Sequence, residues 1–382
     1  MFNYNWELCK VKDFLIESKI KGSNGKIAKK LTVKLWRKGI VAKEEVYEGS
    51  LATQYYVRKS GQFMYGKLDF LNQAFGIVPI ELDGYESTVD SPSFDFKPLV
   101  DSVFFLEYVS LEKFYKYQGN IANGSRKAKR IHVKTFFNMP LPTPSYKEQQ
   151  KIGTLFKQLD DTITLHQRKL DQLKELKKAY LQVMFPAKDE RAPKLRFADF
   201  EEEWELCKLG EIFKERSDRS GEGELISVTI NSGIIKASEL ERKDNSSTDK
   251  SNYKVVKQGD IAYNSMRMWQ GASGFSPFNG ILSPAYTVIS PKENIDGIFM
   301  AYMFKKHDMI QVFKRNSQGL TSDTWNLKFP TLSTIKIKMP LIEEQKKIAK
   351  LLLFLDKTIA IKQNKLNQLK SLKKAYLQNM FI

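Results

Sequence analysis

The chain has 382 residues, and its 62 Lys and Arg against 44 Asp and Glu give a formal net charge of +18. Two cysteines and three histidines argue against a disulfide framework or a zinc site. It contains no run of 18 apolar residues and no apolar N-terminal signal core, so we expect a cytoplasmic protein of about two to three domains. The charge implies an anionic partner, most simply nucleic acid, with a membrane surface as the weaker alternative.

The first part of the chain is predicted to mix short strands with helices. Strands are expected at Gln62–Tyr65, Gly76–Pro79 and Ser102–Phe105, and a helix at Leu111–Tyr117. From Lys10 to Lys43 this part carries eleven Lys or Arg against two acidic residues. Such cations bind backbone phosphates. The predicted nucleic-acid contacts here are Lys19, Lys21, Lys67, Arg126, Lys127, Lys129 and Arg130.

A long helix is predicted over 144–186, and it recurs over 340–382. Aligning Glu148 with Glu344 gives 24 identities in 38 positions without a gap. In each copy the apolar residues recur in steps of three and four, with one step of seven, which predicts a narrow stripe on one helix face. Two such stripes favour an antiparallel coiled coil between the copies. The predicted pairing residues are Ile152, Leu155, Leu159, Ile163, Leu170, Leu173 and Leu176, with Ile348, Leu351, Leu355, Ile359, Leu366, Leu369 and Leu372 in the second copy. The alternative is two separate amphipathic helices, each packed on its own domain.

The second globular part is predicted to repeat the skeleton of the first. Trp6-Glu7-Leu8-Cys9-Lys10 returns as Trp204-Glu205-Leu206-Cys207-Lys208, after a charged linker over 187–199. Strands are expected at Tyr253–Val256, Asp260–Tyr263 and Tyr286–Ile289, and one helix at Ile298–Arg315. Polar loops after a strand and after this helix could reach base edges. The candidate contacts in them are Asn264, Arg267, Trp269, Gln270, Arg315, Asn316, Gln318 and Thr321.

Motifs for catalysis are missing from the sequence. There is no Gly-x-Gly-x-x-Gly, phosphate-binding loop, His-Glu-x-x-His or Cys-x-x-Cys pattern. Scattered carboxylates are more simply explained as solvated surface. We therefore expect no catalytic residue, no metal site and no enzymatic activity in this chain.

Several motifs together carry a resemblance to a known family. They are the Trp-Glu-Leu-Cys-Lys-Leu-Gly start at Trp204, Gly-Asp-Ile-Ala-Tyr-Asn at Gly259, Ser-Pro-Ala-Tyr at Ser283, and Leu-Lys-Lys-Ala-Tyr-Leu-Gln-x-Met-Phe at Leu176 and Leu372. The chain resembles the specificity (S) subunit of type I restriction-modification systems over nearly its whole length. The resemblance implies an α+β fold with two target-recognition domains, at 1–143 and 200–339. The two long helices would join them, with an internal pseudo-twofold repeat.

The same resemblance implies a function. Each target-recognition domain would read one half of a bipartite, asymmetric site in double-stranded DNA. The helices would set the spacer between the halves and dock two methylation (M) subunits. Restriction (R) subunits would join the full complex. S-adenosylmethionine and ATP would bind to those partner subunits, and no cofactor to this chain.

Two other functions remain open from the residues alone. A stand-alone nucleic-acid-binding or RNA-processing protein would bind tightly without methylation subunits and show no bipartite motif. A coiled-coil scaffold with protein-binding domains would lack the steep salt dependence that several phosphate contacts require.

Overall fold

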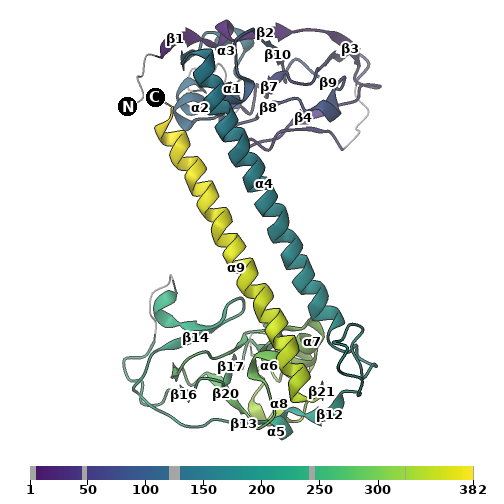
Figure 1. Ribbon diagram of the computed structural model, residues 1–382, viewed down its shortest axis with the longest axis vertical. Helices are drawn as coiled ribbons and strands as arrows, with labels where there is room; N and C mark the ends of the chain where they lie inside the picture. Colours follow the sequence, from purple (N-terminus) through teal and green to yellow (C-terminus); the bar gives the residue numbers. More distant parts are fainter. Residues whose placement is uncertain (1–5, 45–49, 120–129, 241–245, 323, 382) are drawn as a thin grey trace. The chain divides into compact units, whose positions relative to one another are not determined.

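The computed structural model describes residues 6–44, 50–119, 130–240, 246–322 and 324–381 (Figure 1). The chain forms two compact units. Unit 1 consists of Met1–Gln167 and Asn364–Ile382, and unit 2 of Arg168–Gln363. Each unit therefore contains part of both long helices. The domain ranges expected from the sequence kept each helix whole, and they stay a prediction.

Unit 1 is built on a four-stranded antiparallel sheet with strand order β2-β10-β7-β8. These strands are β2 (Leu15–Ser18), β10 (Ser93–Phe96), β7 (Phe63–Tyr65) and β8 (Phe75–Ile77). Smaller sheets pair β1 (Glu7–Lys10) with β11 (Pro140–Thr143), β4 (Leu31–Val33) with β5 (Ile40–Ala42), and β6 (Gln54–Val57) with both β3 (Lys21–Asn24) and β9 (Glu86–Ser87).

We call the part of each unit outside the long helices its head. Among the described residues, the head of unit 1 also contains the short helices α1 (Ser102–Val109), α2 (Glu112–Gly119) and α3 (Val133–Phe137). The strand expected at Ser102–Phe105 is wrong, because these residues begin α1. A short apolar run cannot by itself distinguish a buried strand from a buried helix. Asp101 decides the outcome, since its carboxylate accepts a hydrogen bond of 2.8 Å from the Phe104 amide and caps the helix.

Unit 2 repeats this strand order with β13 (Phe213–Glu215), β20 (Tyr286–Pro291), β17 (Ile261–Asn264) and β18 (Ser273–Phe275). Smaller sheets pair β12 (Glu205–Lys208) with β21 (Lys336–Met339), β14 (Ile226–Thr229) with β15 (Gly233–Lys236), and β16 (Lys254–Val256) with β19 (Gly280–Leu282). The pairs β1–β11 and β12–β21 show that the repeated Trp-Glu-Leu-Cys-Lys segment has the same structural place in both units.

The helices of the unit 2 head are α5 (Leu209–Ile212), α6 (Gly297–Lys305), α7 (His307–Asn316) and α8 (Phe329–Ser333). The single helix expected at Ile298–Arg315 is two helices, because Lys306 has an extended backbone with φ −63° and ψ 140°. This break turns the chain so that Phe304 and Phe313 both reach the core, with ring centroids 5.3 Å apart.

The long helices are α4 (Tyr146–Val183) and α9 (Ile342–Asn379), each of 38 residues. In unit 1 the start of α4 packs on the end of α9, and Lys373 donates to Asp160 at 2.6 Å. In unit 2 the end of α4 packs on the start of α9, and Lys177 donates to Asp356 at 2.5 Å. Antiparallel pairing is thereby confirmed. A pair of helices that each pack only on their own domain is excluded. In the described part of the chain, no helix is both long enough and apolar enough to span a membrane.

The buried face of the helix pair differs from the predicted stripe near one end of each helix. Leu176 and Leu372 are 41% and 40% exposed, so these two pairing predictions are wrong. The next residues, Lys177 and Lys373, take the inward position, because the regular steps of three and four reach them from Leu170 and Leu366. Their aliphatic stems pack while their ammonium groups bind a carboxylate. The remaining predicted pairing residues are buried or half-buried.

Each long helix starts in one unit and ends in the other, and the residues just beyond its end lie in the core of that second unit. Phe185, two residues beyond α4, lies in the core of unit 2 and stacks on Phe299 at 5.3 Å. Phe381, two residues beyond α9, lies in the core of unit 1, with its ring 5.6 Å from Phe104 and 5.7 Å from Phe156. The repeated Met-Phe at the two helix ends is therefore a core anchor in both units.

Candidate nucleic-acid interface

Two of the loops predicted to contact nucleic acid lie beside each other in unit 2. One follows β17 and ends in a 3₁₀ turn at Met268–Gln270, and the other follows α7. The rings of Trp269 and Trp325 meet edge to face at 5.2 Å. The backbone amide of Leu327 donates to the Ser265 carbonyl at 2.9 Å. The structure thus forms one surface from segments separated by 43 residues, and we call it the paired-loop surface (residues 264–271, 315–322 and 324–327).

The predicted residues on the paired-loop surface divide into two groups. In the first group the polar side chains hold the loops in shape. Asn264 accepts from the Met266 amide at 3.0 Å, Asn316 donates to the Val312 carbonyl at 2.9 Å, and the Thr321 hydroxyl lies 3.4 Å from the Thr324 hydroxyl. The second group is directed to solvent or to a neighbour at the surface, and consists of Arg267, Trp269, Gln270, Arg315 and Gln318. These are the better candidates for DNA contacts.

Lys305 anchors the first of these loops, and sequence reasoning missed it. Its ammonium donates to the carbonyl oxygens of Gly271 and Ile230, each at 2.6 Å. Burial lowers the pKa of Lys305 to about 8. Gly271 itself needs to be glycine, since its φ is +81°. Gly271 and Ile230 lie 34 and 75 residues before Lys305, and no pattern in the sequence predicts a hydrogen bond over such a separation.

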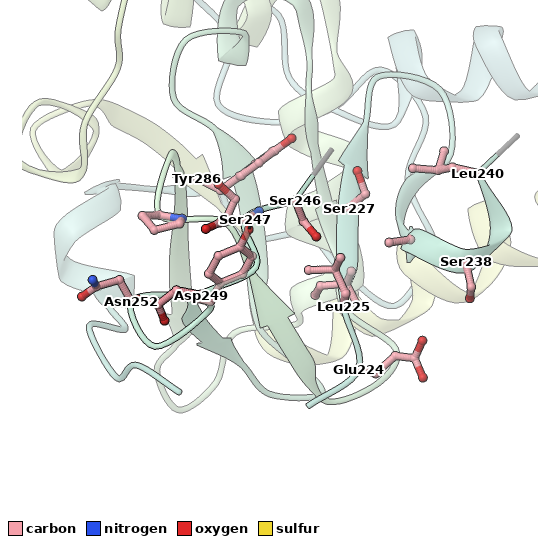
Figure 2. A pocket seen from close by; sticks show the side chains of 15 residues that line it. Glu224, Leu225, Ser227, Ser238, Leu240, Ser246, Ser247, Asp249, Asn252 and Tyr286 are labelled. Carbon is pink, nitrogen blue, oxygen red and sulfur yellow. Dashed lines mark hydrogen bonds between the residues drawn. The ribbon is translucent and has the colours of Figure 1, made fainter. Parts of the chain in front are cut away.

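A cleft of about 920 Å³ opens elsewhere in unit 2 (Figure 2). None of the described residues that line it is Lys or Arg. Hydroxyl groups dominate among the described lining residues, with the amide of Asn252 and the carboxylates of Glu224 and Asp249. Figure 2 shows Ser227, Ser246 and Tyr286 from different segments facing the same space. Such groups suit base edges better than phosphates. Ser283, Pro284 and Tyr286 of the Ser-Pro-Ala-Tyr motif also line the cleft.

In unit 1, the described basic candidates gather around a smaller pocket of about 260 Å³. Lys19 and Lys67 line it, and Lys21 begins the neighbouring strand β3 opposite Tyr56, another lining residue. Lys19 pairs with Glu17 at 2.9 Å, and Arg130 pairs with Asp90 at 3.2 Å. The predicted residues Arg126, Lys127 and Lys129 lie outside the described residues.

The charges around this pocket act on one another. Partial burial lowers the pKa of Lys67, and the nearby cations Arg130 and Lys19 lower it further, against the opposite effects of Asp90 and Glu17. The floor of the pocket is Arg58, a fully buried arginine that sequence reasoning missed. Nothing in its sequence context, between Val57 and Lys59, distinguishes it from the many exposed cations.

The family model and the curated relatives that match this chain carry the same family description. The model of the type I restriction modification DNA specificity domain matches residues 94–175 and 201–371. Two relatives from Methanocaldococcus jannaschii are each 25% identical. The type I restriction enzyme MjaVIII specificity subunit matches over 64% of this chain and 61% of its own length. For the putative type I restriction enzyme MjaX specificity subunit the shares are 71% and 64%. The chain thus spans slightly less than two thirds of each relative.

Solved structures share the fold at low sequence identity. The S subunit of a type I restriction-modification system from M. genitalium is 13% identical and has a TM-score of 0.62, covering 100% of this chain and 97% of that one. A chain from a structure on the assembly and conformational transition of the type I R-M system is 14% identical with a TM-score of 0.51, covering 98% and 96%. The family model matches more than half of the chain, in both of its repeated parts, and the chain therefore belongs to the family of type I restriction-modification DNA specificity proteins.

Proposed function

We propose that this chain is the DNA-reading subunit of a type I restriction-modification complex, in which each head reads one half of a bipartite, asymmetric site. One observation carries the proposal. The two units share their strand order and their helix contacts but differ in the loops and pockets that carry their polar groups. A common frame with unlike reading surfaces is what two unlike half-sites require.

In this proposal α4 and α9 act as the spacer between the half-sites. An insertion that respects the steps of three and four should lengthen the helix pair without breaking it. Seven residues inserted after Gln167 and seven after Gln363 would add roughly 10 Å, close to three base-pair steps. We expect the methylated motif to keep both halves and to gain about three unread base pairs between them.

Methylome sequencing of cells that carry the variant with its methylation partner tests this. The matched control inserts seven residues in α4 alone, which misaligns the inward positions and should abolish methylation. An unchanged spacer in the double insertion would contradict the role of the helices. A methylome without any bipartite motif, even for the wild type, would favour the stand-alone or scaffold alternatives.

Independent reading by the heads is tested by exchange. Replacing Ala198–Pro340 with the corresponding segment of a relative should change only one half of the methylated motif. Altered bases in both halves would show that the heads do not read separately.

The helices are also proposed to dock two methylation subunits. In support, Leu165 and Ile361 are equivalent residues of the two copies, and both are exposed, by 51% and 66%. Exposed apolar side chains at matched positions suit a partner that binds twice. We expect Leu165→Glu with Ile361→Glu to abolish co-purification with the methylation subunit. Ile80→Glu, a control at an exposed apolar residue of the unit 1 head, should leave co-purification intact.

A further inference from the structure

Arg58 differs from the other well-packed arginines of this protein in what neutralises it. Arg37, Arg196 and Arg216 each donate two hydrogen bonds to one carboxylate, those of Glu107, Glu344 and Asp260. These are the bidentate pairs that arginine prefers. Among the described residues, no carboxylate forms an ion pair with Arg58.

The partners of Arg58 are neutral oxygens. Its guanidinium donates to the hydroxyls of Ser87 at 2.8 Å and Ser93 at 2.9 Å. Longer bonds of 3.3 to 3.4 Å reach the carbonyl oxygens of Ser18, Ser87 and Thr88. The side chain is only 2% exposed. The Tyr56 ring lies 5.6 Å from the guanidinium, and the charge of Glu17 acts on Arg58 from a distance without an ion pair. A buried charge without a directly bonded carboxylate is costly, and an anion brought to it gains more than at the surface.

The rest of the pocket adds a second positive charge, on which Asp90 and Glu17 act only from a distance. Lys67 is half-buried in its wall, and no described carboxylate lies within ion-pair distance of it. Glu17 is the one acidic residue among the described lining residues, and it is already paired with Lys19. Val89, Pro92 and Val133 supply apolar walls, which weaken screening by water. The pocket thus has an excess of positive charge from Arg58 and Lys67.

The size of the pocket limits what it can hold. A volume of about 260 Å³ lies below the range of roughly 300–1,000 Å³ that is usual for small-molecule sites. It admits one tetrahedral oxyanion with a few waters. The Ile131 amide donates to the Lys67 carbonyl at 3.0 Å, so the segment that begins with Arg130 is fixed beside this pocket.

We propose that the Arg58–Lys67 pocket binds a single phosphate group of the DNA backbone and fixes the position of the unit 1 head on the duplex. This inference rests on the proposed function and deepens it. The contact carries no sequence information itself, but it sets the register in which the head meets the bases.

The test replaces Lys67, because Arg58 also holds Ser87 and Ser93 and its loss would disturb the fold. Binding of a duplex that carries the methylated motif is measured across salt concentrations, with the full chain and its methylation partner. We expect Lys67→Gln to lower affinity about tenfold and to reduce the slope of log K against log salt by about 0.9. Lys59→Gln is the matched control, since Lys59 is exposed, lies outside the pocket and pairs loosely with Asp83 at 3.7 Å. It should leave the slope unchanged.

A second arm separates DNA phosphate from free phosphate. Inorganic phosphate, compared with chloride at equal ionic strength, should raise the melting temperature of the wild type and of Lys59→Gln but not of Lys67→Gln. If phosphate stabilises the wild type while Lys67→Gln keeps the full salt slope, the pocket holds free phosphate, and the assignment to DNA is overturned. Equal slopes and no effect of phosphate would remove the site altogether. Failure of the proposed function gives a different result from failure of the pocket, because the wild type itself would then show no specific binding to the duplex with the methylated motif.

Discussion

The junctions between helix pair and head use equivalent helix residues in both units, but the head residue that meets them is charged in unit 1 and neutral in unit 2. In unit 1 the pair Lys373–Asp160 meets the buried Glu107, which is 1% exposed and also accepts two bonds of 2.7 Å from Arg37. In unit 2 the equivalent pair Lys177–Asp356 meets the neutral Tyr302, whose hydroxyl donates to Asp356 at 2.6 Å. One junction is a network of four charges, and the other is one ion pair with a phenol.

This difference shows which part of the repeat is constrained. The lysine and aspartate of each helix keep their places, while the head residue that completes the junction can change its charge. A buried ionic network fixes geometry strongly but depends on every member. A head that contacts the helices through a hydroxyl tolerates change better. The two heads can therefore diverge while the helix pair stays the same.

The largest expected effect comes from Glu107→Gln. It leaves Arg37 without the carboxylate that it bonds, and Lys373 with Asp160 as its one ion-pair partner among the described residues. Unit 1 should lose about 3–5 kcal/mol of stability. Tyr302→Phe, the matched change in unit 2, removes one hydrogen bond and should cost about 1 kcal/mol. Hydrogen exchange measured by mass spectrometry resolves the two units. Equal losses would mean that the two junctions do not differ in kind.

The next effect concerns positions where the two units should behave alike. Leu170 in unit 2 and Leu366 in unit 1 are equivalent and fully buried. Leu170→Ala and Leu366→Ala should each destabilise their unit by about 2–5 kcal/mol. The exposed Leu176 and Leu372 are the controls, with an expected cost below about 0.5 kcal/mol on truncation to Ala. Urea titrations of the four variants check this. A large loss at Leu176 would restore the stripe predicted from the sequence.

A smaller contrast lies at the start of the helices. Glu344 accepts two bonds from Arg196, at 2.8 and 2.7 Å, whereas its equivalent Glu148 accepts one bond of 3.4 Å from the Trp6 indole. We expect Glu344→Gln to cost about 1.5–3 kcal/mol and Glu148→Gln less than about 1 kcal/mol. Thermal unfolding of both variants measures the difference. If Glu148→Gln cost more stability than Glu344→Gln, Arg196 would contribute little to the attachment of the linker.

The smallest expected effect is a dependence on pH at the junction of unit 1. Burial would raise the pKa of Glu107, but the bonds from Arg37 and the charge of Lys373 hold it below the ordinary value of 4.5. Its stabilisation is therefore complete above about pH 4.5 and declines as the pH falls through the pKa of the folded state. The stability difference between wild type and Glu107→Gln should be constant from pH 5 to 8 and shrink in acid. Urea unfolding at pH 4 and pH 7 tests this, and a constant difference would contradict it.

The sequence predicts the frame well and the polar sites poorly. The repeat locates the paired helices, and β-rich runs such as Gln62–Tyr65 and Asp260–Tyr263 coincide with the central strands β7 and β17. Lys177 and Lys373 are missed as inward residues, because hydropathy scores a lysine stem as polar even when a carboxylate neutralises its end. Arg58 is missed because its partners come from strands β2 and β10 of one sheet and β9 of another, which only the folded chain brings together. The predicted base-reading residues stay predictions, since the sequence of a loop does not show which of its polar side chains form hydrogen bonds within the loop itself.

The placement of Phe381 in the core of unit 1 has a consequence for how the protein is made. Unit 2 is one continuous stretch, but unit 1 needs the segment Asn364–Ile382, which the ribosome adds only after all of unit 2. At about 5–20 residues per second, the aromatic cluster around Phe104 and Phe156 stays incomplete on the order of ten seconds or more. The second head can therefore finish folding before the first. During that interval the place of Phe381 beside Phe104 and Phe156 stays unfilled, and a separate peptide of residues 364–381 should be able to occupy it.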